Sequence, residues 1–386
     1  MGIAQQITWR GRSATRLANG IVELNVLSEG GHLAEFRFVK ETCESQLNVL
    51  WDAPWITSVQ SEQRPEDLLE TAGFTGHALC LDRFGPTSAD EAARGIPTHG
   101  EAAAKSWKRV PSGDGTDSFV RWDVQLPAAN LQFERQIRLG NQESVAYIKE
   151  RVSNRGDVDR ACHWVQHATF SPPFVNSTDS SFVVSGHRGI TSESEYEGGS
   201  LLAVNREFLW PYAPHNGMDD SNADLRRPFS IKGRGFLAGI QLDPRREVEY
   251  LLALNWKLRL GVGYCFRRDD FPWMAIWEEN CARQNAPWNG TTQARGMEFG
   301  TTPLPLGHDE ILRKGPIFGT PGWCSISAGG TKTAQYLLFL FSLPEDMTSV
   351  EELEVKSNAI VLYDQTAKPS ISIDAHGCQD FLSSRR

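Results

Sequence analysis

The chain lacks the features that mark several large classes of protein. It has no excess of basic residues, because 39 Lys and Arg stand against 48 Asp and Glu, for a formal net charge of -9. A dedicated nucleic-acid binder would show a basic patch or stripe, so no nucleic-acid partner is expected. The most apolar run, residues 336–341 (YLLFLF), is far too short to span a bilayer. It is predicted to be a buried strand, and no membrane partner is expected.

Cysteine is scarce and follows no motif. The seven cysteines are widely scattered and no CxxC pair occurs, which favours reduced thiols over a disulfide framework. The first ten residues contain no basic stretch followed by an apolar run, so no signal peptide is visible. These patterns predict a cytoplasmic protein. The acidic balance also fits a neutral small-molecule ligand better than a polyanionic one.

Helical periodicity is nearly absent. Only residues 65–71, 89–94 and 349–357 are predicted to be helical, and each segment is short. Elsewhere apolar and polar residues alternate at the two-residue period of half-buried strands. The clearest predicted strands are residues 21–27, 32–38, 131–139, 144–152, 236–242, 249–254 and 333–338. Residues 112–117 and 219–224 are predicted to be polar loops.

Many short strands, punctuated by 34 Gly and 20 Pro, predict an all-β fold, a large antiparallel β-sandwich. No repeat of fixed period occurs, and no Pro-rich or Ser-rich linker is long enough to separate two domains. Residues 1–386 are therefore predicted to form a single domain.

Three short segments, far apart in the sequence, each present a proton-transfer side chain. They are residues 95–101 (GIPTHGE) with His99, residues 163–170 (HWVQHATF) with His163 and His167, and residues 296–303 (GMEFGTTP) with Glu298. Histidine titrates near physiological pH, and a glutamate among apolar neighbours has its pKa raised toward the same range. Histidines and one strand-borne carboxylate are what general acid–base chemistry on a sugar ring requires.

Each of these residues also has a simpler explanation that the sequence leaves open. His167 alone fits a hydrogen-bonded core histidine, and Glu298 alone fits a solvent-facing strand residue. Because Met297 and Phe299 flank Glu298, alternation places Glu298 on the face opposite theirs. His163 and His167, with His99 and Glu101, also suggest metal ligands, but histidines four residues apart on a strand are too distant to chelate one ion easily. No metal and no other cofactor is therefore expected.

Tryptophan is plentiful, with 12 residues in the chain. Indole faces stack on the C–H surfaces of sugars, although they also fill large β cores. Trp210 and Trp288 lie in loop-like contexts and are the better candidates for contacts with a sugar. Residues 277–280 (WEEN) bring two carboxylates together, which suggests a second acid pair, but a solvated turn is the favoured prediction.

In order and spacing, residues 21–305 resemble the galactose mutarotase-like superfamily, the aldose 1-epimerases and their relatives. The resemblance rests on the Gly30-Gly31 hairpin followed by residues 47–51 (LNVLW), on residues 82–86 (DRFGP) ahead of 97–100 (PTHG), on residues 152–156 (VSNRG) leading into 163–170, and on residues 296–300 (GMEFG). The chain departs from the family pattern after the second histidine, where Ala168-Thr169-Phe170 replaces Tyr-Phe-Asn. Residues 288–292 (WNGTT) resemble an inserted loop.

The resemblance implies a β-supersandwich whose concave face binds a sugar and interconverts its anomers. Glu298 would take the proton of the anomeric hydroxyl, and His167 would give a proton to the ring oxygen. His99 would hydrogen-bond a sugar oxygen or support the developing charge, and Arg83 would bind hydroxyls. The acidic sugar-binding residue is expected among Asp219, Asp220 and Asp224.

Other functions are compatible with the same fold. One is a carbohydrate lyase or hydrolase, against which the lack of a visible secretion signal counts, and another is a non-catalytic carbohydrate-binding protein. A hexose-6-phosphate epimerase would need a cluster of cations at the pocket rim, for which Arg83, Arg94 and Arg295 are the candidates. The expected partner is a small-molecule sugar or sugar derivative, and the sequence leaves its identity and the oligomeric state open.

Overall fold

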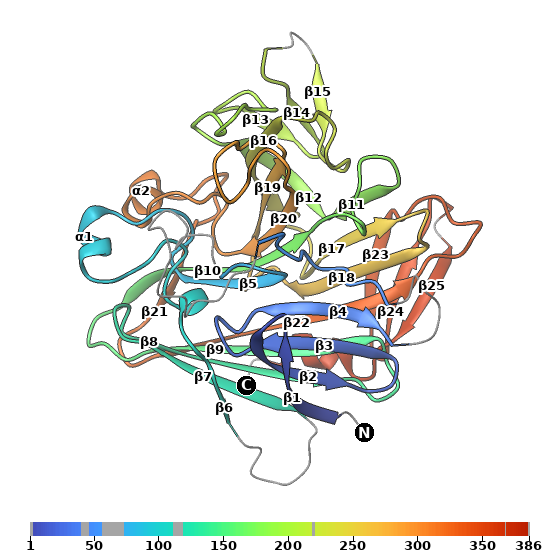
Figure 1. Cartoon of the computed structure of the whole chain (residues 1–386), viewed down its shortest axis with the longest axis horizontal. Helices are drawn as coiled ribbons and strands as arrows, with labels where there is room; N and C mark the ends of the chain where they lie inside the picture. Colours follow the sequence, from blue (N-terminus) through green and yellow to red (C-terminus); the bar gives the residue numbers. More distant parts are fainter. Residues whose placement is uncertain are drawn as a thin grey trace.

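The computed structural model describes residues 3–39, 46–55, 73–110, 119–217, 221–366 and 368–384. Strands dominate this part of the chain and form three antiparallel sheets (Figure 1). Side chains from both large sheets share one apolar cluster, which is the main core. The prediction of a large, antiparallel all-β fold is confirmed.

The largest sheet has fourteen strands within the described residues. Its hydrogen-bonded order is β1-β2-β3-β4-β5-β10-β20-β19-β16-β12-β13-β14-β15, with β21 paired to β10. The strands are β1 (Ile3–Trp9), β2 (Arg12–Ala18), β3 (Val22–Leu27), β4 (Leu33–Phe38), β5 (His77–Asp82), β10 (Arg160–Phe170), β12 (Gly186–Thr191), β13 (Glu207–Leu209), β14 (Tyr212–Pro214), β15 (Asn222–Asp224), β16 (Arg234–Leu242), β19 (Trp273–Asn280), β20 (Gln293–Gly300) and β21 (Cys324–Ile326).

The second sheet has eight strands in the order β11-β17-β18-β22-β9-β8-β7-β6. They are β6 (Lys108–Val110), β7 (Val120–Leu126), β8 (Leu131–Leu139), β9 (Val145–Asn154), β11 (Ser180–Val184), β17 (Val248–Asn255), β18 (Leu260–Arg267) and β22 (Thr331–Ser342). The strand predicted at residues 131–139 coincides with β8. The apolar run at residues 336–341 lies inside β22 and is buried, as expected.

A small third sheet consists of β23 (Glu352–Lys356), β24 (Ala359–Tyr363) and β25 (Pro369–Asp374). It packs with helix α3 (Cys378–Ser383) on the face of the eight-stranded sheet that points away from the main core, through a second apolar cluster. The helix predicted at residues 349–357 is therefore wrong, since this segment contains β23. Leu353 lies opposite Leu362 on β24 and is buried, and this cross-strand contact stabilises the extended conformation. The single-domain organisation of residues 1–386 stays a prediction.

Helices are few and short in the described residues. Helix α1 (Ala89–Ala93) matches the prediction for residues 89–94 and begins with a capping box between Ser88 and Glu91. Helices α2 (His308–Lys314) and α3, and the 3₁₀ turn η2 (Ala102–Ala104), were not predicted. None of these helices is long and apolar enough to cross a membrane. The predictions for residues 65–71 and 112–117 lie outside the described residues.

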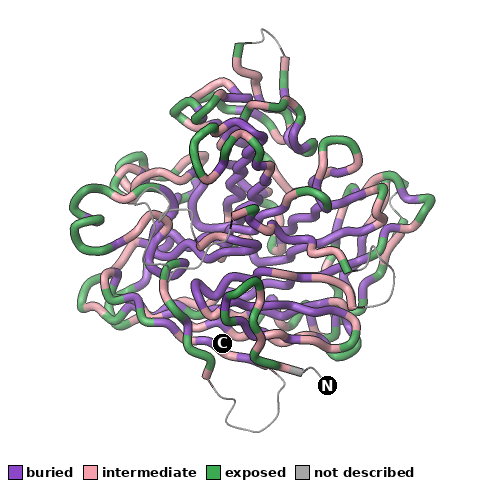
Figure 2. The backbone as a smooth tube through the Cα atoms, in the orientation of Figure 1, coloured by how far each residue is buried: buried purple, intermediate pink, exposed green. Residues whose placement is uncertain are grey.

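The predicted catalytic residues His167 and Glu298 lie on strands in the middle of the fourteen-stranded sheet. Strands β5, β10, β20 and β19 are consecutive neighbours, and Figure 2 shows buried backbone through the centre of the molecule. In the register, His167 lies opposite Ala78 on one side and Glu298 on the other. Met297 and Phe299 belong to the main core. The expectation that Glu298 lies on the opposite face is confirmed.

Candidate active site

His167 and Glu298 are cross-strand neighbours whose side chains meet. Nε2 of His167 lies 3.1 Å from Oε1 of Glu298, but the atoms are not aligned for a hydrogen bond, and Oε1 has no hydrogen-bond partner in the described structure. Gly296 leaves the space that the carboxyl group occupies, since a Cβ at Gly296 would lie 2.3 Å from Oε1. Buried polar atoms without a partner are rare in proteins. The missing partner of Oε1 is therefore an unusual feature of this carboxyl group.

Burial sets the protonation of this pair. It raises the pKa of the Glu298 carboxyl well above its usual range. Burial, with a further contribution from His99, lowers the pKa of His167 to about 3. Burial therefore favours the neutral carboxyl form of Glu298 and the neutral imidazole form of His167. Nδ1 of His167 is 2.9 Å from the Thr169 hydroxyl, which fixes the plane of the ring.

His99 completes a group of three proton-transfer residues. Its ring centroid lies 6.2 Å from that of His167. The backbone N–H of Gly85 donates to Nδ1 of His99 at 3.2 Å, so the neutral ring carries its proton on Nε2 and can donate from there. Burial, followed by the charge of Arg283, lowers the pKa of His99 to about 4. His99 is thus a neutral hydrogen-bond donor at physiological pH.

The three residues line one cavity of about 310 Å³. Its walls are mostly aromatic, and the rings that contribute are Trp51, Phe74, Phe84, Trp277 and Trp288. Trp55 supports this wall with edge contacts to Trp51 and Trp288, at ring distances of 5.6 and 4.9 Å. A concave, largely apolar site with a few convergent polar groups is typical of a small-molecule binding site.

The sequence pattern missed the cation of this pocket, Arg283. Its guanidinium carbon lies 4.7 Å from the ring centroid of Trp288 and 5.0 Å from that of Tyr196. The predicted solvated turn at residues 277–280 is wrong, because these residues end the buried strand β19. Arg283 follows that strand directly. No periodic signal marked it, although an arginine between two tryptophans, Trp277 and Trp288, is a combination that aromatic stacking favours.

Arg83 does not line this pocket. Its Nε donates to Oε1 of Glu91 and its Nη1 to Oδ2 of Asp82, both at 2.7 Å, and its side chain is buried. The following residues Phe84 and Gly85 reach the cavity instead. The guanidinium links α1 to the end of β5 and lies outside the lining of the cavity, so the expected contact of Arg83 with sugar hydroxyls is not supported.

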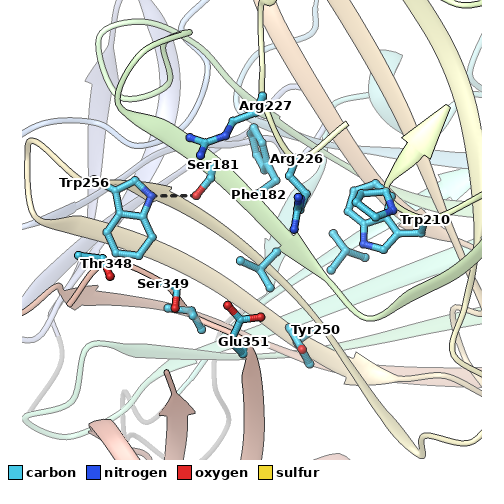
Figure 3. A pocket seen from close by; sticks show the side chains of 14 residues that line it. Ser181, Phe182, Trp210, Arg226, Arg227, Tyr250, Trp256, Thr348, Ser349 and Glu351 are labelled. Carbon is cyan, nitrogen blue, oxygen red and sulfur yellow. Dashed lines mark hydrogen bonds between the residues drawn. The ribbon is translucent and has the colours of Figure 1, made fainter. Parts of the chain in front are cut away.

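The other expected sugar contacts divide in the same way. Trp288 lines the catalytic cavity, as expected. Trp210 lines a different cavity of about 360 Å³, together with Tyr250 and Trp256 (Figure 3). Asp219 and Asp220 lie outside the described residues. Asp224 is paired with Arg226 at 2.8 Å and does not line the catalytic cavity.

The alternative of a metal site has little geometric basis. No group of three His, Cys, Asp or Glu side chains that could hold a metal ion occurs in the part of the chain that the structure describes. Nδ1 of His163 accepts the backbone N–H of Phe84 at 3.2 Å. Glu101 accepts the backbone N–H of Ala129 at 3.0 Å. Both residues are thus used in local structure away from His99 and His167.

The architecture, two large antiparallel sheets with the pocket on the face of the larger sheet that points away from the shared core, is that of the galactose mutarotase-like fold. No protein-family model and no curated protein matches the sequence. Solved structures do match. A galactose mutarotase-like protein of Clostridium acetobutylicum superposes with a TM-score of 0.59 at 14% identity, over 88% of this chain and 99% of that one.

Two further structures agree. A galactose mutarotase related enzyme of Lactobacillus acidophilus gives a TM-score of 0.54 at 13% identity, over 90% of this chain and 100% of that one. A Klebsiella pneumoniae protein, provisionally named an aldose 1-epimerase, gives a TM-score of 0.60 at 12% identity, over 87% of this chain and 80% of that one. At such identities the similarity establishes the shared fold, and the chemistry has to be argued from the site.

Proposed function

We propose that the protein is an aldose 1-epimerase-like isomerase that interconverts the anomers of a neutral sugar. The observation that carries this proposal is the convergence of His99, His167 and Glu298 in one aromatic-lined cavity. These are the groups that the ordered sequence motifs nominated. Solved structures that share the fold, and carry mutarotase and aldose 1-epimerase names, support the proposal.

The proposed chemistry needs one proton removed and one supplied. Glu298 takes the proton of the anomeric hydroxyl while His167 gives a proton to the ring oxygen, so the bond from C1 to the ring oxygen breaks and the C1 carbonyl forms. After rotation about the C1–C2 bond, the ring oxygen attacks the other face of C1. His167 then recovers its proton and Glu298 returns one to the new anomeric hydroxyl. The Nε2–H of His99 supports charge on a sugar oxygen.

The reaction starts from a Glu298 carboxylate and a protonated His167, whereas burial favours the neutral form of both side chains. Nε2 of His167 lies 3.1 Å from Oε1 of Glu298, so a small reorientation on substrate binding would align the two groups for transfer of the proton from Glu298 to His167. A sugar hydroxyl that donates to the Glu298 carboxyl group, which lines the cavity, stabilises the carboxylate and so favours this transfer. Substrate binding would thereby create the base and the acid together. Each such positioned group contributes about 10²–10⁴-fold to rate.

The charges around the cavity favour a neutral substrate over a sugar phosphate. Among the described residues, Arg283 is the one cation in its lining, and the carboxylates of Glu197 and Glu279 lie 3.7 and 3.6 Å from Nε of Arg283. Arg295 is buried against Glu278, and Arg94 is exposed on α1's C-terminal side. The cationic cluster that a phosphate requires is therefore not assembled by Arg83, Arg94 and Arg295.

The test is anomer interconversion by variants of the acid–base pair. Glu298→Gln and His167→Asn keep polar contacts but cannot exchange protons near neutrality. We expect each to lower the enzyme-catalysed rate by about 10²–10⁴-fold, and the double variant to be no worse than the more damaging single variant. Polarimetry or NMR of freshly dissolved pure anomers, over a panel of hexoses and pentoses, measures the rate. His187→Asn, at an exposed position, is the control.

Two results would decide against parts of the proposal. Wild-type protein that binds sugars but accelerates no anomer exchange would be a non-catalytic carbohydrate-binding protein. Undiminished activity in Glu298→Gln would exclude this residue as the base, whatever the substrate.

A further inference from the structure

A second cavity, of about 190 Å³, adjoins the catalytic pocket. The two cavities share Leu237 and Arg283 as lining residues. We refer to the second one as the outer cavity and define it by Ser192, Ser194, Glu195, Tyr196 and Glu197. These residues follow β12, so a segment distant in sequence from the catalytic residues extends the site beyond Arg283.

The junction between the cavities is firmly built. Nε1 of Trp277 donates to the Tyr196 hydroxyl at 2.7 Å, and that hydroxyl donates to Oε2 of Glu279 at 2.9 Å. Oε1 of Glu279 accepts the backbone N–H of Arg283 at 3.2 Å. Gly235 makes room for the Tyr196 ring, because a Cβ there would lie 2.2 Å from it. A wall residue of the catalytic pocket is thus linked directly to a wall residue of the outer cavity.

Arg283 lies at this junction and lines both cavities. Its guanidinium is stacked against Trp288 on the catalytic side and Tyr196 on the outer side, at 4.7 and 5.0 Å. Nε of Arg283 is buried and makes no hydrogen bond in the described structure, since Glu279 and Glu197 are 3.6 and 3.7 Å away. Nε is enclosed, but the Arg283 side chain lines both cavities, so the remaining N–H groups of the guanidinium are the donors that a ligand oxygen would meet.

The two cavities differ in chemistry. The catalytic pocket is walled largely by aromatic rings, whereas the outer cavity combines hydroxyls and carboxylates with apolar residues such as Leu202 and Phe236. Oγ of Ser192 accepts the backbone N–H of Ser194 at 3.2 Å, which leaves the Ser192 hydroxyl proton available. Glu195 and Glu197 offer acceptors and repel anions. This lining suits a neutral group rich in hydroxyls and disfavours a phosphate or a uronate.

We propose that the substrate is a reducing oligosaccharide, whose reducing ring occupies the catalytic pocket and whose next ring occupies the outer cavity. Arg283 binds hydroxyls of both rings at the junction. The assignment of the reducing ring rests on the proposed function, whereas the occupation of the outer cavity is a statement about binding. The outer cavity therefore sets specificity for chain length.

The experiment compares sugars that share one reducing ring. Binding of glucose, maltose and cellobiose to the full-length protein is measured by titration calorimetry, and anomer exchange of the same sugars by NMR. The variant Ser194→Trp fills the outer cavity, and Ser372→Trp, at an exposed position on β25, is the matched control. We expect wild type to favour at least one disaccharide over glucose by about tenfold or more. Ser194→Trp should abolish this preference for the disaccharide, and Ser372→Trp should preserve it.

The outcomes separate the two proposals. A disaccharide preference in binding that Ser194→Trp removes supports the outer cavity even if no anomer exchange is accelerated, in which case the proposed function fails alone. Equal binding of glucose and both disaccharides overturns the inference, as does a preference that survives Ser194→Trp. Anomer exchange of glucose and the disaccharides at equal efficiency would likewise overturn the inference and leave the proposed function intact.

Discussion

At the scale of the residue, the site depends on ionisable groups that water does not solvate. Glu298 and His167 are buried and His99 is half-buried, and burial is the first cause of each shifted pKa. Cys80, beneath them, also has its pKa raised by burial and then by Glu298. Burial thus favours the neutral form of every one of these groups. The low dielectric that keeps them neutral also strengthens the hydrogen bonds they make with a substrate.

The glycine at position 296 gives a sharp test of this geometry. In Gly296→Ala the new Cβ would lie 2.3 Å from Oε1 of Glu298 and 3.3 Å from Cε1 of His167. The carboxyl group is the end of a flexible side chain and can move aside, so the fold should tolerate the change. We expect anomer exchange to fall about 10²-fold or more, because the displaced base loses its near-attack position, while the thermal midpoint shifts by only a few degrees.

The control for that prediction is Gly307→Ala. A Cβ at Gly307 meets nothing within 4 Å, so this variant should retain both activity and stability. If Gly296→Ala kept full activity, Glu298 would not need its present position, and its role as the base would be in doubt.

Sequence patterns found part of this site and missed the rest for identifiable reasons. His99, His167 and Glu298 were nominated by strand alternation and ordered motifs, and Trp288 by its loop-like context, all of which are features of local sequence. Arg283 was missed, because its role arises from stacking on rings that come from distant segments. Arg83 was assigned a sugar contact, since the motif around it does not reveal the buried carboxylate of Glu91 that the fold places beside it.

At the scale of the element, β10 joins the catalytic face of the large sheet to a polar network in the core. Glu150 on β9 accepts from Nε of Arg135 at 2.7 Å and from the Tyr336 hydroxyl at 2.9 Å. Nε1 of Trp164 and Nε2 of Gln166, both on β10, donate to its other oxygen at 3.0 and 2.6 Å. This network ties strands of the second sheet to β10, and therefore supports the strand that carries His167.

Removing the cation of this network should be costly. Arg135 and Glu150 both have fully buried side chains, and Arg135→Met leaves the Glu150 charge uncompensated. We expect the free energy of unfolding to fall by about 3–5 kcal/mol, measured by urea denaturation. The exposed pair of Arg188 and Glu207 is the control, since Arg188→Met should cost no more than about 1 kcal/mol. Equal losses of unfolding free energy in Arg135→Met and Arg188→Met would mean that the buried pair stabilises the fold no more than the exposed pair does.

Strand positions were predictable where one face is buried, and this is clearest for β8. Its alternation of buried and half-buried residues is the pattern that the two-residue period describes. The segment that contains β23, residues 349–357, was predicted to be a short helix. The segment is a strand instead, because β23 pairs with β24. Such pairing joins two separate segments and cannot be read from the periodicity of one of them.

At the scale of the whole molecule, the fold buries an unusual set of neutral histidines. Burial lowers the pKa of His77, His163 and His167 to about 3 and that of His99 to about 4, from an ordinary value of 6.5. In the unfolded chain these side chains bind protons as the pH falls below 6.5, whereas in the fold they stay neutral. A lowered histidine pKa therefore contributes stability that is fully present above pH 6.5 and is lost as the pH falls toward 3.

Buried carboxyl groups act in the opposite direction over part of this range. Burial raises the pKa of Glu249 to about 7 and that of Glu298 well above 4.5. These groups bind protons in the fold but not in the unfolded chain above pH 4.5, so they destabilise the fold as the pH rises through that window. Between pH 4.5 and 6.5 the two sets partly cancel. Below pH 4.5 the unfolded carboxyl groups are protonated too, and the histidines no longer meet this opposition. Asp243, whose pKa is lowered to about 2 by its hydrogen bond from Arg245, adds to the loss of stability there.

We therefore expect a stability profile that declines gently from pH 6.5 to 4.5 and steeply below it. Each histidine that must stay neutral contributes a slope of about 1.4 kcal/mol per pH unit, so the four together should unfold the protein before pH 3. Urea denaturation at a series of pH values measures the slope. His77→Gln keeps a polar side chain beside Tyr264 and Gln166. In this variant the slope of unfolding free energy against pH below pH 4.5 should fall by the contribution of one histidine, about 1.4 kcal/mol per pH unit. A free energy of unfolding that stays constant from pH 6.5 to 3.5 would contradict the prediction, because it would mean that these histidines take up protons inside the fold without cost.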